Sequence, residues 1–263
     1  MVISFLFIVS GKCYSQIQDE GLAEQKVSSP AQFNLGADLV SRYIWRGKDF
    51  GNSPAIQPNV TFSVAGFKIG AWGSFGFVPY TEQINDSTSV NMGNYAEVDP
   101  FVSYTLKGFT LAVTDFFTIN GLTPNSGNYF NYKNSTTGHT FEISLAWAGP
   151  DKFPLQLFVG TLVYGADKGK DSEGNYGLGT TNNYSTYFEA AYPFTIKGVG
   201  VKPFIGGIPF GSSWYCPTSG IVNAGLTVSK TLQITKEFGL PLFTSIVVNP
   251  QSQCVFFVFG LSL

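Results

Sequence analysis

Charge is scarce in this sequence, and so are the residues that build metal sites. Of 263 residues, 15 are Lys or Arg and 17 are Asp or Glu, about half the charged share of a soluble globular protein. The net charge of −2 provides no basic field for a nucleic-acid partner. One histidine and three cysteines form no spaced set of metal ligands. We therefore expect no cofactor, no bound metal, no nucleic-acid partner and no enzymatic activity.

Long hydrophobic runs are also missing. The longest apolar runs, such as Cys254–Leu261, have about eight residues, whereas a membrane helix needs about 18–20. Aromatic residues nevertheless make up 16% of the chain, a composition that suits a membrane better than water. A closed β-barrel is the membrane-spanning architecture that needs no long apolar run.

The first residues are typical of an exported protein. Met1–Val9 is apolar, and Cys13 and Ser15 are the small residues expected before a cleavage after Ser15. No basic residue precedes Lys12, which leaves the start of translation open. We predict a signal peptide over residues 1–15, a flexible periplasmic segment over residues 16–32 and a barrel over residues 33–263.

Apolar and polar residues alternate from residue 33 to the end of the chain. In Asn59–Val64, Phe67–Phe77 and Thr140–Trp147, apolar side chains occupy every second position, which is the strand period. Segments of about ten such residues match the tilted strands of outer-membrane barrels. We predict an all-β, antiparallel, up-and-down transmembrane barrel of about 12 strands. The strands are Phe33–Trp45, Ala55–Ala65, Phe67–Phe77, Tyr95–Leu106, Phe109–Ile119, His139–Trp147, Leu155–Tyr164, Tyr184–Phe194, Val199–Ile208, Ile221–Thr231, Leu242–Val248 and Cys254–Leu263.

Connections between these strands alternate in length. Gly66 and Lys107-Gly108 are short turns, whereas every second connection is longer, with Asn249–Gln253 the exception. Outer-membrane barrels have short periplasmic turns and long outer loops. We therefore expect a Gram-negative outer membrane, extracellular loops and periplasmic termini. The long connections are Arg46–Pro54, Val78–Asn94, Asn120–Gly138, Gly165–Asn183 and Pro209–Gly220.

The sequence predicts two partners, namely the outer-membrane assembly machinery and outer-membrane lipid. The apolar residues of the last strand alternate and the chain ends on Leu263, which resembles the C-terminal strand recognised by the outer-membrane assembly machinery. The apolar face of the predicted wall would contact outer-membrane lipid. Aromatic residues at strand ends, such as Tyr43, Trp45 and Trp147, are expected at the membrane interfaces. The oligomeric state is left open.

Charged residues fall almost entirely on the predicted inner face. The candidates for lining the lumen or a constriction are Asp38, Arg42, Arg46, Asp99, Glu142, Glu189 and Lys202, with Arg46 at the outer rim. One interpretation is a constriction near Arg42 with acids such as Asp99 and Glu142 opposite. The other, which we favour, is a set of salt bridges that brace the wall. Asp115 falls on the lipid face unless a bulge shifts the register there.

These features favour a narrow porin for the passive diffusion of small solutes. Bulky inward residues, namely Trp72, Phe158, Tyr187 and Phe256, predict a narrow lumen. The alternative is a structural or surface-interaction barrel with a plugged lumen. A lipid hydrolase is less favoured, because the single histidine, His139, has no serine among its same-face neighbours on the strand.

Two cysteines remain after removal of the predicted signal peptide. Cys216 lies in a predicted outer loop, and Cys254 begins the last strand near the same rim. An oxidising compartment favours a disulfide between them. The alternative is a pair of free thiols.

The stretch Ala37–Gly47 resembles the opening strand of the TorF-like porins of Gram-negative outer membranes. The shared pattern, SxYxxRG, occurs here as Ser41, Tyr43, Arg46 and Gly47. The specific resemblance covers about eleven residues, and the general strand pattern covers the rest of the mature chain. The resemblance implies an outer-membrane barrel with a transport role, and it indicates neither a substrate nor catalytic residues.

Overall fold

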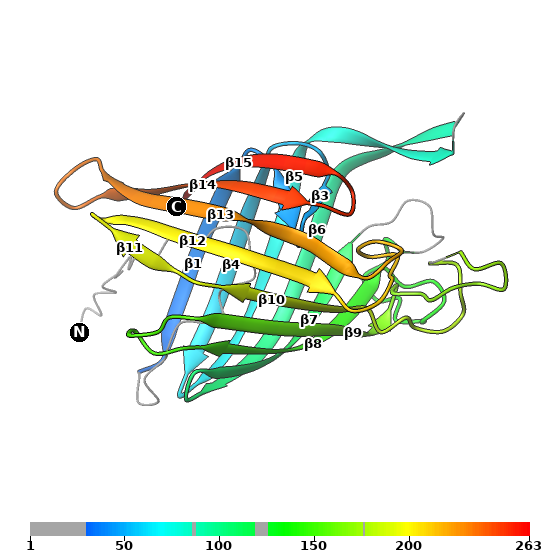
Figure 1. Cartoon of the computed structure of the whole chain (residues 1–263), viewed down its shortest axis with the longest axis horizontal. Coiled ribbons are helices and arrows are strands. Elements are labelled where there is room, and N and C mark those ends of the chain that lie inside the picture. Colours follow the sequence, from blue (N-terminus) through cyan, green and yellow to red (C-terminus); the bar gives the residue numbers. More distant parts are fainter. Residues whose placement is uncertain (1–29, 86–87, 119–125, 176) are drawn as a thin grey trace, which may run out of the picture.

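Antiparallel strands close into a barrel in the computed structural model, which describes residues 30–85, 88–118, 126–175 and 177–263 (Figure 1). The strands are β1 (Gln32–Val40), β2 (Tyr43–Trp45), β3 (Lys48–Phe50), β4 (Ala55–Val64), β5 (Phe67–Asn85), β6 (Thr88–Leu106), β7 (Phe109–Thr118), β8 (His139–Ala148), β9 (Gln156–Gly165), β10 (Thr186–Ala191), β11 (Phe194–Ile196), β12 (Val199–Ile208), β13 (Gly220–Gln233), β14 (Gly239–Asn249) and β15 (Cys254–Ser262). The predicted signal peptide and residues 16–29 of the predicted periplasmic segment lie outside the described residues. In the part of the chain that is described, no helix is long and apolar enough to cross a membrane.

The wall consists of twelve strands. Thirteen strands form one sheet, and β10 and β11 are consecutive parts of a single wall strand, since both pair with β12. The pairing of β10 with β12 closes the sheet, while β1 lies between β4 and β15. The predicted fold class and strand number are confirmed.

The two faces of the wall differ in polarity, as the alternation predicts. Phe67 and Ile69 on β5 are 57% and 59% exposed on the outer face, whereas Thr61 and Ser63 on the neighbouring β4 are buried on the inner face. Successive strand residues point to opposite sides of a sheet. One apolar and one polar surface therefore follow directly from the sequence period.

Short turns gather at one end of the barrel. Lys107-Gly108 and Lys197-Gly198 are two-residue turns in which both φ angles are positive, the geometry of a type I′ turn that matches the twist of a hairpin. Figure 1 shows these turns at the end opposite to the loops that follow β9 and β12. The predicted sorting of short and long connections is therefore present in the structure.

The predicted loop Val78–Asn94 is wrong. β5 and β6 continue through most of it as a two-stranded ribbon, paired from Pro79↔Asn94 to Asn85↔Thr88, which projects beyond the barrel in Figure 1. The neighbouring strands stop earlier, since β4 begins opposite Gly76 and β7 ends opposite Glu97. A ribbon without wall neighbours needs no continuous apolar face, so its sequence can have the polar composition of a loop.

Candidate functional site

The chain leaves the wall at Ser41 and enters the lumen. The Ser41 backbone N–H donates to Phe259 O (2.8 Å), and the Phe259 N–H donates to Ser41 Oγ (2.9 Å). β2 and β3 beyond this point pair only with each other. The hairpin they form, β2–β3, turns at Arg46 and Gly47, where φ is +48° and +80°.

This hairpin corrects two sequence predictions. Phe33–Trp45 is not one wall strand, because β1 ends at Val40. Tyr43 and Trp45 are not interfacial aromatics, since they are 3% and 5% exposed inside the barrel. Alternation predicts a strand, but it does not distinguish a strand in the wall from one folded into the lumen.

The tip of the hairpin contacts β14 and β13, the second and third wall strands from β1. A Cβ atom on Gly47 would lie 1.9 Å from Val222 O on β13, so only glycine fits this position. Asn249 Nδ2 donates to Gly47 O at 3.0 Å. The hairpin tip therefore rests against this part of the wall.

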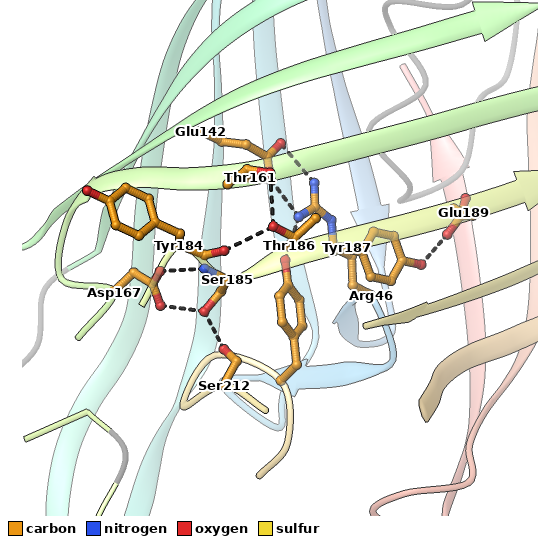
Figure 2. A network of polar contacts seen from close by, with 11 residues as sticks. Arg46, Glu142, Thr161, Asp167, Tyr184, Ser185, Thr186, Tyr187, Glu189 and Ser212 are labelled. Atoms are coloured by element: carbon orange, nitrogen blue, oxygen red, sulfur yellow. Dashed lines mark hydrogen bonds and ion pairs between the residues drawn. The ribbon is translucent and has the colours of Figure 1, made fainter. Parts of the chain in front are cut away.

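Arg46 fixes the hairpin to β8. Its Nη1 lies 2.6 Å from Glu142 Oε2 and its Nη2 lies 2.9 Å from Glu142 Oε1, a bidentate pair whose side chains are 4% and 2% exposed (Figure 2). Nη1 also donates to the Tyr215 hydroxyl at 2.6 Å. The guanidinium carbon lies 4.4–4.9 Å from three ring centroids, those of Trp45, Phe158 and Tyr187. Only arginine offers both a planar donor pair and a stacking face.

The two arginines of the hairpin have different partners. Arg46, placed at the rim by the sequence, is the buried partner of Glu142. Arg42, for which one interpretation was a constriction opposite Asp99 and Glu142 and the favoured one a bracing salt bridge, pairs with Asp49 of the same hairpin at 2.9 Å and donates to Asn52 Oδ1 at 2.6 Å. Its side chain is about one third exposed, so it braces the base of the hairpin.

The loops that follow β9 and β12 bond to each other, and the loop after β12 contacts the hairpin. The Ser185 hydroxyl donates to Asp167 Oδ1 and its backbone N–H donates to Asp167 Oδ2 at 2.8 Å; Ser185 Oγ also bonds Ser212 Oγ (Figure 2). Ser212 Oγ accepts the Trp214 N–H, which helps to place Trp214 and Tyr215 against Trp45. Burial raises the pKa of Asp167, and the hydrogen bonds from Ser185 oppose this shift.

Apolar packing fills the lumen at the same level. Ile44 of the hairpin belongs to a buried cluster with residues from six wall strands, namely Val40, Ala55, Ala191, Phe204, Phe243, Val247 and Val258. Trp72, Phe158 and Phe256 pack against this and two neighbouring clusters, and Tyr187 is buried in one of them. The bulky residues that predict a narrow lumen thus take part in packing inside the barrel.

The other predicted lumen residues lie on four different wall strands. Asp38 and Lys202 are half-buried on β1 and β12. Glu189 on β10 accepts hydrogen bonds from the Tyr187 hydroxyl and from Asn223 Nδ2. Asp99 is buried on β6 beside Glu97, which accepts a hydrogen bond of 2.6 Å from the Tyr95 hydroxyl. Tyr215, from the loop between β12 and β13, completes the Arg46 site.

Asp115 lies on the outer face, as its sequence parity predicted, and no bulge shifts it. The β7–β8 register is continuous from Phe109↔Trp147 to Phe117↔His139. His139 Nδ1 lies 2.8 Å from Asp115 Oδ2, and the loop residue Tyr132 stacks on the His139 ring with centroids 4.3 Å apart. A polar pair on the outer wall is thus covered by the loop that precedes β8.

The geometry of His139 bears on the hydrolase alternative. Its Nε2 lies 2.6 Å from the carbonyl oxygen of Tyr129. A carbonyl only accepts, so Nε2 carries a proton and is not presented as a base to a hydroxyl group. The pair serves to hold the loop in this arrangement.

The two cysteines match the alternative of free thiols and not the disulfide. Cys216 and Cys254 are free thiols, and their Sγ atoms donate to Thr218 O and Ser252 O. The expected disulfide is not formed. Within the described ranges, no group of three His, Cys, Asp or Glu residues could hold a metal ion.

Part of the chain is similar to a protein family whose description assigns no activity. Residues 24–152 match the model of a family described as "Bacterial protein of unknown function (Gcw_chp)". The match extends from β1 to β8 and so includes the hairpin, Glu142 and His139. No curated protein matches the chain.

Proposed function

We propose that this protein is an outer-membrane β-barrel that acts as a narrow channel for the passive diffusion of small solutes, with the β2–β3 hairpin as its gate. The observation that carries the proposal is that the hairpin leaves the wall at Ser41 and is fixed across the lumen by Arg46. A segment that crosses the lumen without joining the wall can move while the barrel stays closed.

The inner wall on the side of the short turns supports a passage. Small hydroxyl side chains gather there on the inner face: Thr61, Ser63, Ser103, Thr105, Thr110, Thr227 and Ser245. A polar inner face agrees with a passage for small polar solutes. The resemblance of Ser41, Tyr43, Arg46 and Gly47 to the TorF-like porins agrees with this proposal.

A second candidate is a plugged barrel with a structural or surface-binding role. It is favoured by the apolar packing of Ile44 against wall strands. A permanently packed hairpin would leave the long loops as the working surface.

Conductance of the refolded protein in planar bilayers separates the two candidates. We expect wild type to show small, infrequent openings, and Arg46→Ala to open more often because the hairpin loses its partner on β8. Asp171→Asn, in an exposed loop, is the control and should behave as wild type. If folded wild type and Arg46→Ala are both silent, the channel proposal is wrong and the plugged barrel is favoured.

A further inference from the structure

Two buried carboxyl groups on β6 have no basic partner among the described residues. Glu97 and Asp99 both face the lumen and are each 4% exposed. Neither acid belongs to the ion pairs Arg42–Asp49, Arg46–Glu142 and His139–Asp115, and the charged or polar side chains beside them are acids and tyrosines. Buried charges are normally paired or neutralised, because leaving water is costly for an isolated ion.

The two acids are only partly satisfied by their neighbours. Glu97 accepts a hydrogen bond of 2.6 Å from the Tyr95 hydroxyl, and Tyr43 and Asp99 lie beside it. Asp99 accepts the backbone N–H of Phe117, but its Oδ1 is buried without any hydrogen-bond partner. Two carboxylates cannot bond each other unless a proton or another cation lies between them.

Aromatic rings surround this pair. Asp99 lies directly opposite Trp72 in the β5–β6 register. The Tyr43 ring of the hairpin lies 5.3 Å from Trp72 and 5.9 Å from Tyr95, measured between ring centroids. Ring faces attract cations and replace part of their hydration. This combination of a carboxylate pair and ring faces is the chemistry that recognises an organic ammonium group.

We propose that Glu97, Asp99, Tyr43 and Trp72 form a binding site for a small ammonium-type cation in the lumen. The N–H groups of the cation would donate to Asp99 Oδ1 and Glu97, and its positive charge would face the rings. A metal ion fits less well, because hard cations require six or more oxygen ligands. The inference rests on the proposed function in two respects, namely that the cation reaches the site through the lumen and that the hairpin carrying Tyr43 is the gate.

The site also connects binding to the gate. Tyr43 belongs to the hairpin, whereas Glu97, Asp99 and Trp72 belong to the wall. A cation bound between them would contact both the moving and the fixed part. Small amines are therefore the substrate class that the site selects.

Calorimetric titration of the refolded barrel in detergent with methylammonium chloride tests the site. We expect saturable binding that Asp99→Asn weakens about tenfold or more, since it removes the charge of the acceptor. Trp72→Leu should weaken it less. Glu189→Gln is the matched control. It also removes a carboxylate from the lumen, but Glu189 is not part of the proposed site and accepts hydrogen bonds from Tyr187 and Asn223. Each variant is first shown to be folded by its heat-modifiable migration.

Three outcomes overturn the inference: no saturable binding to wild type, equal binding to Asp99→Asn, or equal competition by sodium and potassium. The first of these means that a proton is the only counter-ion of the pair. Conductance of the same samples keeps the two proposals apart. Binding without conductance contradicts the channel alone, whereas conductance without binding contradicts the amine site alone.

Discussion

At the scale of single residues, Arg46 joins the hairpin to β8 and to the loop after β12. Its Nη1 donates to Glu142 and Tyr215, its Nη2 donates to Glu142, and three aromatic rings lie next to the guanidinium group. A charge this far from water is stabilised only while each partner stays in place. We therefore expect the hairpin to have a single closed position, and we expect a substitution of Arg46 or Glu142 to destabilise that position.

Arg46→Ala should destabilise the barrel more than Arg42→Ala. The first change leaves Glu142 buried without its partner, a loss of about 3–5 kcal/mol for a buried pair. The second breaks a partly exposed pair with Asp49, worth about 0–1 kcal/mol. Urea unfolding followed by tryptophan fluorescence measures both. Equal free energies of unfolding for the two variants would contradict the assignment of Arg46 as the buried anchor.

Cys216 and Cys254 should both react with an alkylating reagent in denatured protein without reductant. Each thiol bonds a nearby backbone carbonyl in the structure, Thr218 O or Ser252 O, and neither bonds the other. Intact-mass measurement with and without prior reduction checks this. A mass gain from alkylation that appears only after reduction would show that a bridge forms in the exported protein.

At the scale of elements, the long loops are held by buried polar contacts. The loop before β8 is fixed to the outer wall through His139, while the loops after β9 and β12 are joined by Asp167, Ser185 and Ser212. Loops with such contacts keep a defined shape. They can therefore hold Tyr215 over the hairpin.

His139→Phe should release the loop before β8. The substitution keeps a ring but removes the hydrogen bonds to Asp115 and Tyr129, and it leaves a buried carboxyl without a partner. We expect faster trypsin cleavage after the exposed Lys133 in the folded protein. Asp115→Asn retains an acceptor for Nδ1 and should have a smaller effect. An unchanged cleavage rate in His139→Phe would mean that the ring packing alone holds the loop.

The turn at Asp171 should depend on pH. Hydrogen bonds from the backbone and side-chain amide of Asn175 lower the pKa of Asp171 below its ordinary value. The ionised form therefore stabilises the turn above the ordinary carboxyl pKa, and this contribution is lost as the pH falls through the lowered value. Hydrogen exchange of the Asn175 amide should be faster in Asp171→Asn than in wild type at neutral pH. The difference should vanish in acid; a difference that persists there would exclude the carboxylate as its cause.

At the scale of the whole molecule, the sorting of connections predicts the orientation in the membrane. Strand β7 begins after the turn at Lys107-Gly108 and leads to the loop that contains Ser135, so these two sites lie at opposite ends of the barrel. In a background in which Cys216 and Cys254 are replaced by serine, we expect an impermeant thiol reagent to label Ser135→Cys on intact cells and to miss Lys107→Cys. The reverse pattern would show that the long loops face the periplasm.

Much of the architecture could be predicted because it depends on local rules. The period-2 alternation predicted the twelve wall strands apart from the end of the first, and Gly66 and Lys107-Gly108 were predicted as short turns. The course of the chain after Val40 could not be predicted, because Tyr43–Trp45 alternates like the wall strands. The ribbon beyond Phe77 was missed for the opposite reason, since strands without wall neighbours need no continuous apolar face.

The sequence by itself determined the class of the fold, the polarity of each face and the end at which the long loops gather, because these depend on period and connection length. Only the tertiary structure decided which arginine is buried, that Asp115 meets His139 under a loop, and that Tyr215 reaches Arg46 from 169 residues away. Such contacts join residues far apart in the chain. They exist only once the barrel has closed and the hairpin has crossed it, so no local pattern records them.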